Sequence, residues 1–308
     1  MAKMISNIVF TKNRPLQLEA YLASLYRHLP EELIQTYIVY KADRFGEQYA
    51  ELFHRFSRCF IIKEQDFCRD FMNLIEQIDT KYILFGTDDV VYYNSVNFAV
   101  IDETFSKFTK EIFGFSLKLH PQSLRMKNEI IVETVINGEN IYYVNWKNAK
   151  SRNAKYPFEL DSTLYRTTLV REIITHIAAE RPVLKKVFQD GSLQVKILSH
   201  IISMKNFLAS METFHCPNTL EGYGYRWCKT HKSKMPEFLY FQKLCASAIQ
   251  VNIVNTSVNN PTDGSSEHTV EALNEKYKQG FRFDIEAIER NRPKATHVGR
   301  EYFRFVKK

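Results

Sequence analysis

The chain has 308 residues, enough for one large domain or two small ones. Hydrophobic residues make up 44% and charged residues 25%, which is the balance of an ordinary water-soluble globular protein. Five cysteines without a CxxC pair argue against a disulfide framework and favour a reducing compartment. The net charge of +7 favours anionic partners such as nucleotides, phospholipid headgroups or nucleic acid.

The opening residues, MAKMISNIVF, lack the apolar region of a signal peptide. No run of about 18 apolar residues occurs, which argues against a membrane-spanning helix. These two features together predict a cytoplasmic protein.

The first half of the chain alternates short apolar strands with amphipathic helices. The predicted strands are 5–10, 36–40, 59–62 and 82–85, and the predicted helices are 16–29, 47–56 and 68–78. Such alternation is typical of βαβ units, so the fold class is predicted as α/β, with a mostly parallel sheet flanked by helices. Ligands bind outside the carboxyl ends of the strands in such sheets, where loops 11–14, 41–43 and 87–89 would converge.

The second half of the chain is less regular. A hairpin is predicted around Asn137-Gly138, a turn pair that favours two-residue loops. Asn218 is a candidate cap for a helix starting within 216–222, and Gly280 is a candidate helix end. The other predicted elements are strands at 112–119 and 250–254, helices at 168–177, 192–209, 238–249 and 270–279, a strand-rich stretch at 156–165 and a polar loop at 255–266.

Two adjacent carboxylates, Asp88 and Asp89, follow the predicted strand 82–85. Carboxylates beside a buried strand are costly unless a positive group neutralises them. A divalent cation such as Mg²⁺ or Mn²⁺, carrying a phosphate ligand, would do so because these ions prefer oxygen donors. The alternative is a solvated turn with two ordinary aspartates. No GxGxxG follows the first strand and no GxxxxGK[ST] occurs, which argues against a dinucleotide-binding or P-loop protein.

Several stretches, taken in order, resemble a nucleotide-sugar-dependent glycosyltransferase of the GT-A fold, of the family 2-like kind found in bacteria. They are FTKNRPLQL at 10–18, YIVYKA at 37–42, YILFGTDDV at 82–90, FELDSTLYR at 158–166 and PNTLE at 217–221. The resemblance implies a Rossmann-type donor half over 1–110 and an acceptor-side C-terminal elaboration over 111–289. The many Lys and Arg residues of 290–308 predict a basic tail.

The resemblance implies that one carboxylate of the acidic pair meets the nucleotide ribose and the other holds Mn²⁺ or Mg²⁺ against the diphosphate. Asp89 is the expected metal ligand, and Asp88 is the expected ribose or metal contact. Val90 stands where many GT-A enzymes carry a third acidic residue, so a true DxD motif is absent.

The same resemblance implies further contacts to the nucleotide. Thr11 and Arg14 lie in the first loop, Asp43 follows the second strand and would meet the base, and Arg69 begins the third helix and would reach a phosphate. The alternative for each is an ordinary surface residue.

An inverting transfer needs one general base to take the proton of the acceptor hydroxyl. The candidates are Glu221, Asp161 and Asp190, and the sequence does not decide between inversion and retention. Glu221 lies near a predicted helix start, where a carboxylate is stabilised by the helix dipole whatever its function.

His268 is a candidate metal ligand, because several GT-A enzymes add a C-terminal histidine to the metal; the alternative is a surface histidine. Trp146, Trp227 and Tyr225 are candidates for stacking on sugar rings, although aromatic residues are more often found in the core.

The predicted activity is transfer of a sugar from a nucleotide-sugar donor to a saccharide or lipid-linked acceptor, in bacterial surface polysaccharide synthesis. The tail 290–308 mixes basic and aromatic residues, which suits contact with an anionic membrane at the inner face, or else a solvated tail.

One alternative to the transferase is a non-catalytic protein that binds a nucleotide-sugar or glycan. The other is a nucleic-acid-binding protein, but no helix-turn-helix, zinc-finger or RNP signature occurs, so no nucleic-acid partner is expected.

Overall fold

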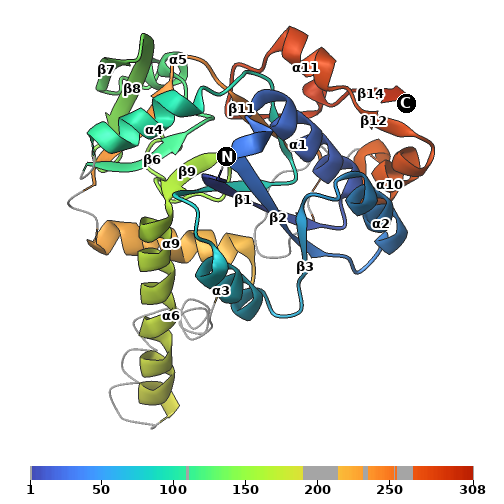
Figure 1. The fold of residues 1–308 in the computed structure, drawn as a ribbon, viewed down its shortest axis with the longest axis horizontal. Coiled ribbons are helices and arrows are strands. Elements are labelled where there is room, and N and C mark those ends of the chain that lie inside the picture. The colour runs from blue at the N-terminus through green and yellow to red at the C-terminus, as the bar shows by residue number, and fades with distance from the viewer. Residues whose placement is uncertain are drawn as a thin grey trace.

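The computed structural model describes residues 2–108, 111–189, 214–231, 235–252, 254 and 266–307. Its centre is a mixed sheet built from β1 (Ile5–Lys12), β2 (Ile34–Lys41), β3 (Phe60–Lys63), β4 (Tyr82–Thr87), β6 (Ile112–Ser116), β7 (Ile131–Ile136), β8 (Glu139–Asn145), β9 (Thr163–Arg166) and β10 (Glu237–Phe241). The strand order is β3-β2-β1-β4-β9-β6-β10-β8-β7 (Figure 1). All of these strands except β8 and β9 run in one direction, which confirms the predicted α/β class.

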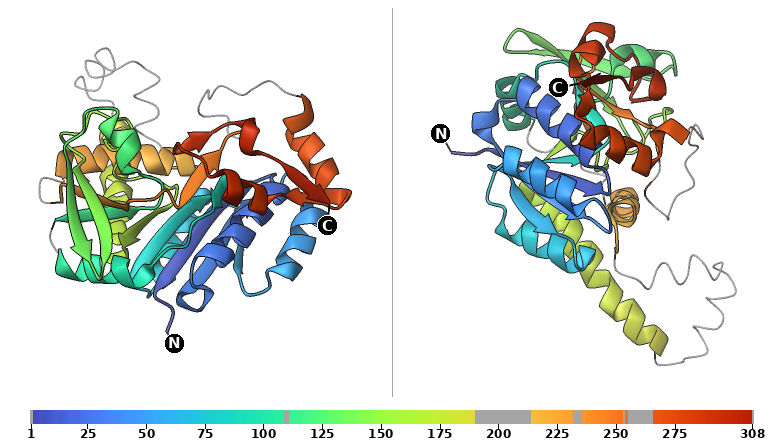
Figure 2. Two further views of the ribbon diagram at one scale, coloured as in Figure 1. Left: turned by 90° about the horizontal axis from the view of Figure 1, so that it is seen from above. Right: turned by 90° about the vertical axis from the view of Figure 1, so that its right-hand side faces the viewer.

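Helices cover both faces of this sheet (Figure 2). Neighbouring residues of a strand point to opposite faces, so Val9 and Ile8 of β1 belong to different core clusters. Val9 shares its cluster with residues of α1 (Pro15–His28), α2 (Gly46–Arg55) and α4 (Phe98–Lys107). Ile8 shares the other cluster with residues of α3 (Phe67–Gln77), α6 (Thr167–Gln189) and α9 (Pro217–His231).

Local chemistry at the helix starts explains why the first half matches its prediction within a few residues. Pro15 stands at the first position of α1, where a missing N–H costs nothing. Asp66 caps α3, accepting a backbone N–H three residues on. Asn97 caps α4 in the same way, although no helix was predicted there. These short-range signals are readable from the sequence.

The predicted hairpin is also present, between β7 and β8. Asn137 and Gly138 both adopt positive φ angles, 50° and 81°. Two positive φ angles are what a tight hairpin turn requires, and Asn-Gly supplies them at low cost.

The predicted helix 238–249 is wrong, because this stretch forms β10 and β11 (Ala246–Ile249). The residues from Phe238 to Phe241 are all buried, and a continuous apolar run suits a central strand as well as a helix.

The predicted strand 250–254 is absent from its described residues, 250–252 and 254, and Asn218 lies inside α9 instead of capping it. The predicted helix 192–209 lies outside the described residues.

Two small sheets complete the fold. One has the order β13 (His297–Val298), β11 and β5 (Val90–Tyr92), and the other pairs β12 (Phe281–Phe283) with β14 (Phe305–Lys307). The remaining elements are α5 (Pro121–Arg125), α10 (Val270–Lys278), α11 (Ile285–Asn291), and the short helices η1 (Glu31–Leu33), η2 (Ser266–His268) and η3 (Arg300–Tyr302).

The segment predicted as a basic tail, 290–308, is folded in its described part. Phe303 is buried in a third core cluster with Phe283, and with Leu16 and Ala20 of α1. The C-terminal elements accordingly lie beside α1 and α2 (Figure 1). Among the described helices, none combines the length and the apolar character needed to cross a bilayer.

Candidate functional site

Arg14 and Asp88 form a buried ion pair where β1 and β4 end. Arg14 Nη1 lies 2.9 Å from Asp88 Oδ1, and Thr11 Oγ1 donates to Asp88 Oδ2 at 2.8 Å. Tyr49 OH accepts the backbone N–H of Arg14 at 2.9 Å and lies 2.8 Å from Thr11 Oγ1. Asp88 is only 3% exposed, and both of its oxygens are already engaged.

The negative charges of Asp88 and Asp89 keep the Arg14 guanidinium charged. Burial lowers the pKa of Arg14, but attraction to Asp88 and Asp89 outweighs burial and leaves the pKa raised. Arg14 therefore stays a fixed positive charge. Its Nη2 also donates to the backbone carbonyl of Asn252, which ties the residues after β11 to the same corner.

Asp89 and Asp161 face one another across Thr87. Thr87 Oγ1 lies 2.8 Å from Asp89 Oδ1 and 3.5 Å from Asp161 Oδ1. Burial raises the pKa of Asp89 to about 6; Arg14 opposes this rise, and the charges of Asp161 and Asp88 add to it. A carboxylate with this pKa favours a bound cation, whether a proton or a metal ion.

Sheet topology explains how Asp161 reaches this position. β9 lies between β4 and β6 and is antiparallel to both. The start of β9 therefore lies at the edge where β4 and β6 end. Asp161 precedes β9, Thr87 ends β4 and Lys118 follows β6, so three segments distant in sequence meet at one edge.

Lys118 provides a second buried cation. Its Nζ lies 3.0 Å from Glu159 Oε2 and contacts Asp161 Oδ2, and the side chain is only 4% exposed. Burial raises the pKa of Glu159 to about 7, although Lys118 acts in the opposite direction. His297 Nε2 lies 3.8 Å from the same Asp161 oxygen.

Glu221 joins the cluster through the backbone. Its Oε1 accepts the N–H of Leu160 at 3.0 Å, so α9 holds the loop that carries Asp161. Burial raises the pKa of Glu221 to about 7. The alternative reason for a carboxylate at this position was stabilisation by the helix dipole. That alternative does not explain why the Glu221 carboxylate accepts a hydrogen bond from a loop in another segment.

The structure thus brings together Thr11, Arg14, Asp88, Asp89, Asp161 and Glu221. It does not bring Asp43 or Arg69 into these contacts. Asp43 is exposed and pairs with Lys12 at 3.7 Å, and Arg69 is exposed and pairs with Asp70 at 3.4 Å. Asp190 lies outside the described residues.

His268 lies near the Arg14 corner but turns its ring elsewhere. Its backbone carbonyl accepts a hydrogen bond from Asn252 Nδ2 at 2.9 Å. Its ring packs edge-on against Phe303, with ring centroids 5.7 Å apart. The described contacts therefore do not place this imidazole beside Asp89.

The donor groups present fit a divalent cation at Asp89. This carboxylate supplies the oxygen donors that Mg²⁺ and Mn²⁺ prefer, and a bound cation would offset its burial. Asp88 fits less well, because Arg14 and Thr11 hold its two oxygens. Within the described ranges, no three His, Cys, Asp or Glu side chains already form a metal-binding group.

Four residues of this site were not among the candidates drawn from the sequence: Tyr49, Lys118, Glu159 and His297. Lys118 follows β6 at the carboxyl edge, so the rule that pointed to 87–89 applies to it as well. No sequence pattern points to Tyr49 or His297, because the residues that they contact lie far away in sequence.

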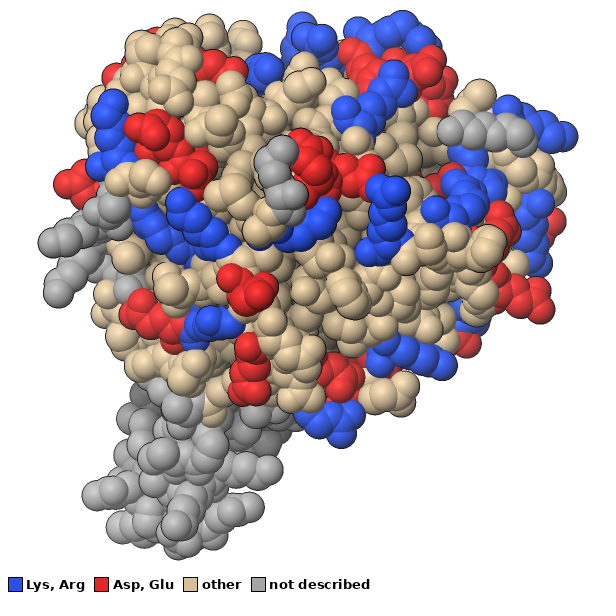
Figure 3. Space-filling model, in the orientation of Figure 1, with Lys and Arg blue, Asp and Glu red and all other residues tan. Residues whose placement is uncertain are grey.

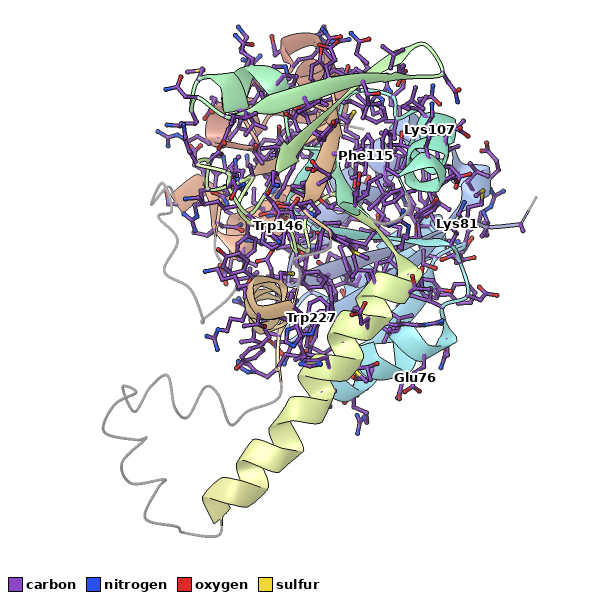
Figure 4. All side chains as sticks on the ribbon, turned by 90° about the vertical axis from the view of Figure 1, so that its left-hand side faces the viewer. Glu76, Lys81, Lys107, Phe115, Trp146 and Trp227 are labelled. Atoms are coloured by element: carbon purple, nitrogen blue, oxygen red, sulfur yellow. The ribbon has the colours of Figure 1, made fainter. Side chains whose placement is uncertain are left out.

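The three aromatic candidates lie largely inside the molecule. Trp146 and Trp227, labelled in Figure 4, are each 5% exposed and belong to the core cluster under α9. Tyr225 is half-buried and packs on Tyr156 with ring centroids 4.3 Å apart.

On the face drawn in Figure 3, basic and acidic side chains are interspersed, so that face carries no patch of a single sign for nucleic acid.

Comparison with known proteins supports the predicted enzyme class. No protein-family model matches the chain. The chain is 26% identical over 193 residues to the bifunctional glycosyltransferase pgtA of Dictyostelium discoideum. The match covers 55% of this chain but only 25% of the Dictyostelium protein.

Solved structures give a weaker likeness. TarS of S. aureus matches with a TM-score of 0.40 and 16% identity, over 55% of this chain and 29% of TarS. The mannosyltransferase PcManGT of Pyrobaculum calidifontis, solved with GDP-Man and Mn²⁺, matches with a TM-score of 0.38 and 10% identity, over 57% and 47% of the two chains. Scores of this size do not establish a common fold, so the fold assignment rests on the observed strand order.

Proposed function

We propose that the chain transfers a sugar from a nucleotide-sugar donor to a saccharide or lipid-linked acceptor, with a divalent cation held at Asp89. The observation that carries this proposal is the pair of carboxylates, Asp89 and Asp161, joined through Thr87 at the carboxyl edge of the sheet. Ligands of α/β sheets bind at this edge. The similarity to a glycosyltransferase supports the reaction class.

On the donor side, the chain supplies a rigid corner. Arg14, Asp88, Thr11 and Tyr49 fix one another, so the loop after β1 is held in place before a ligand arrives. Preorganisation of this kind lowers the entropic cost of binding. A cation at Asp89 would supply Lewis-acid assistance to the departing nucleoside diphosphate.

On the acceptor side, we assign the general base to Asp161. The acceptor hydroxyl would give its proton to this carboxylate while its oxygen bonds to the anomeric carbon. The bond from that carbon to the donor phosphate oxygen breaks at the same time, and because the acceptor oxygen attacks from the opposite face, the configuration is inverted. Glu221, with a pKa of about 7, holds the loop at Leu160 and is the second candidate for the base.

The cellular setting is the remaining part of the proposal. The stretch at 10–18 resembles a bacterial group, which supports a role in surface polysaccharide synthesis. Arg300, Arg304 and Lys307 are exposed, so a basic surface is available for an anionic membrane. All three aromatic side chains of this segment, however, are buried or half-buried: Tyr302, Phe303 and Phe305.

Thermal unfolding tests the proposal directly. The native chain, Asp89→Ala and Asp79→Ala would be melted with a panel of nucleoside diphosphates and nucleotide-sugars, with and without Mn²⁺. A ligand that binds only the folded state raises the melting temperature. We expect one nucleotide to stabilise the native chain in the presence of Mn²⁺, and Asp89→Ala to abolish that shift.

Asp79 serves as the matched control, because it is exposed between α3 and β4, at the opposite edge of the sheet. Asp79→Ala should keep the nucleotide shift in full. A panel in which no nucleotide shifts the native chain would contradict the proposal. A nucleotide shift without any sugar transfer would favour the alternative of a non-catalytic binding protein, which the Val90 position also suggests.

A further inference from the structure

Lys118 is a buried ammonium with two carboxylate neighbours, Glu159 and Asp161. Its Nζ lies against Glu159 Oε2 and Asp161 Oδ2. A buried lysine is costly unless it is paired, and an apolar residue fills such a space at lower cost. The arrangement therefore calls for a reason beyond packing.

The backbone around Lys118 is clamped from several directions. The N–H of Leu117 donates to the carbonyl of Ser162 at 2.9 Å, and the carbonyl of Lys118 accepts from Thr296 Oγ1 at 3.1 Å. The base of the lysine is thus fixed to the turn beside Asp161 and to the segment that precedes His297. Because the backbone of Lys118 is fixed, its ammonium group can hold the Asp161 carboxylate in one orientation.

The turn that carries Asp161 is strained. Ser162 is fully buried with a φ of 63°, the left-handed region that costs a residue with a side chain about 1–2 kcal/mol. Strain of this kind persists where the surroundings over-determine the conformation, often at functional sites. Here the turn directs one Asp161 oxygen toward Thr87 and the other toward Lys118.

We propose that Lys118 is a positioning residue of the transfer step. It holds the Asp161 carboxylate toward Thr87 and Asp89, and it balances the charge of Glu159, so that Asp161 is ready to take the acceptor proton. This inference rests on the proposed function, and it concerns the acceptor side of the reaction and not donor binding.

The test compares Lys118→Met with the charge-balanced double variant Lys118→Met/Glu159→Gln. The single variant leaves two carboxylates facing one another without a cation, whereas the double variant restores the balance. We expect Lys118→Met to lower kcat about 100-fold, the lower end of a general-base contribution. The KM for the donor should change less than about threefold, and the double variant should regain about tenfold in kcat.

Lys81 provides the matched control. It is labelled in Figure 4, precedes β4 at the opposite edge, and pairs with Asp102 on the surface. Lys81→Met should therefore keep the native kcat. Lys118→Arg retains the charge and should keep at least about a tenth of the native kcat, and it carries the test if Lys118→Met does not fold.

Three results would overturn the inference: a native kcat in Lys118→Met, a double variant no better than the single one, or a Lys118→Arg variant as slow as Asp161→Asn. Each of these would leave the nucleotide-induced thermal shift, and with it the proposed function, intact. A native chain with neither a nucleotide shift nor transfer would instead remove the proposed function and this inference together.

Discussion

Arg14 and Asp88 lie at a point of the sheet edge that bulk water scarcely reaches. Each would be costly alone, and removing one partner of such a pair typically costs about 3–5 kcal/mol. Thr11 donates to the second Asp88 oxygen, and Tyr49 OH accepts the backbone N–H of Arg14 and contacts Thr11 Oγ1. The result is a rigid corner next to Asp89, whose own burial is only partly compensated.

At the same scale, Glu221 predicts a pH dependence of stability. Burial raises its pKa from 4.5 to about 7. Between these two values the folded state binds more protons than the unfolded state, so the free energy of unfolding contributed by Glu221 falls as the pH rises. Glu221→Gln lacks this contribution, and it should gain on the order of 2 kcal/mol relative to the native chain between about pH 5 and pH 8.

Urea unfolding at the two pH values measures this difference. Glu76→Gln is the control, because Glu76 is exposed on α3 (Figure 4), and its difference from the native chain should stay within about 0.5 kcal/mol. A difference between Glu221→Gln and the native chain that does not change with pH would contradict the expectation.

At the scale of elements, α9 places Glu221 by packing closely on the FELD stretch. Gly224 faces Phe158, and a Cβ added at Gly224 would lie 2.1 Å from the Phe158 ring. The close approach of helix and loop lets Glu221 reach the N–H of Leu160. The stretch PNTLEGYG at 217–224 therefore forms the start of α9 and also makes its contacts with Phe158 and Leu160.

Two glycines of α9 give a matched pair of variants. Gly224→Ala should lower the free energy of unfolding by about 1–3 kcal/mol, because the Phe158 ring would have to move. Gly222→Ala meets nothing within 4 Å and should raise the free energy of unfolding by about 0.5–1 kcal/mol, as expected for a helical glycine. Urea unfolding distinguishes the two, and equal effects at both positions would show that α9 does not pack as described.

At the scale of the whole molecule, the C-terminal segment packs against the first helix. Phe303 contacts Phe283 with ring centroids 5.1 Å apart and belongs to the same cluster as Leu16 of α1. Arg14, which ends the loop before α1, also bonds to Asn252 after β11. The Arg14 corner and α1 are therefore held by contacts with the C-terminal half of the chain.

This arrangement predicts that Phe303→Ala destabilises the whole fold. Truncating a buried Phe costs about 3–5 kcal/mol through lost burial and the cavity left behind. Val306→Ala is the control, because Val306 is 38% exposed, and its cost should stay below about 1 kcal/mol. Equilibrium urea unfolding measures both, and a Phe303→Ala variant as stable as Val306→Ala would argue that 290–308 is a solvated tail.

Features that depend on short-range order could be predicted from the amino-acid pattern. Hydrophobic periodicity predicted the alternation of the first half and with it the class of fold, and the Asn137-Gly138 pair predicted the hairpin turn. The position of Asp88 and Asp89 just after a buried strand predicted an acidic edge. These signals are local, because backbone preference and hydrophobic pattern act within a few residues.

Which charged side chains meet depends on how the strands are ordered in the folded sheet. Lys118 and Asp161 are 43 positions apart, and they touch because β9 enters the sheet antiparallel between β4 and β6. Asp161 reaches the acidic edge because β9 pairs with β4, whereas Asp43 and Arg69 follow β2 and β3, which lie on the other side of β1. The stretch 238–249 forms two strands because β10 pairs with β6 and β8 and β11 pairs with β5 and β13, and a buried apolar run takes its conformation from the neighbours that pair with it.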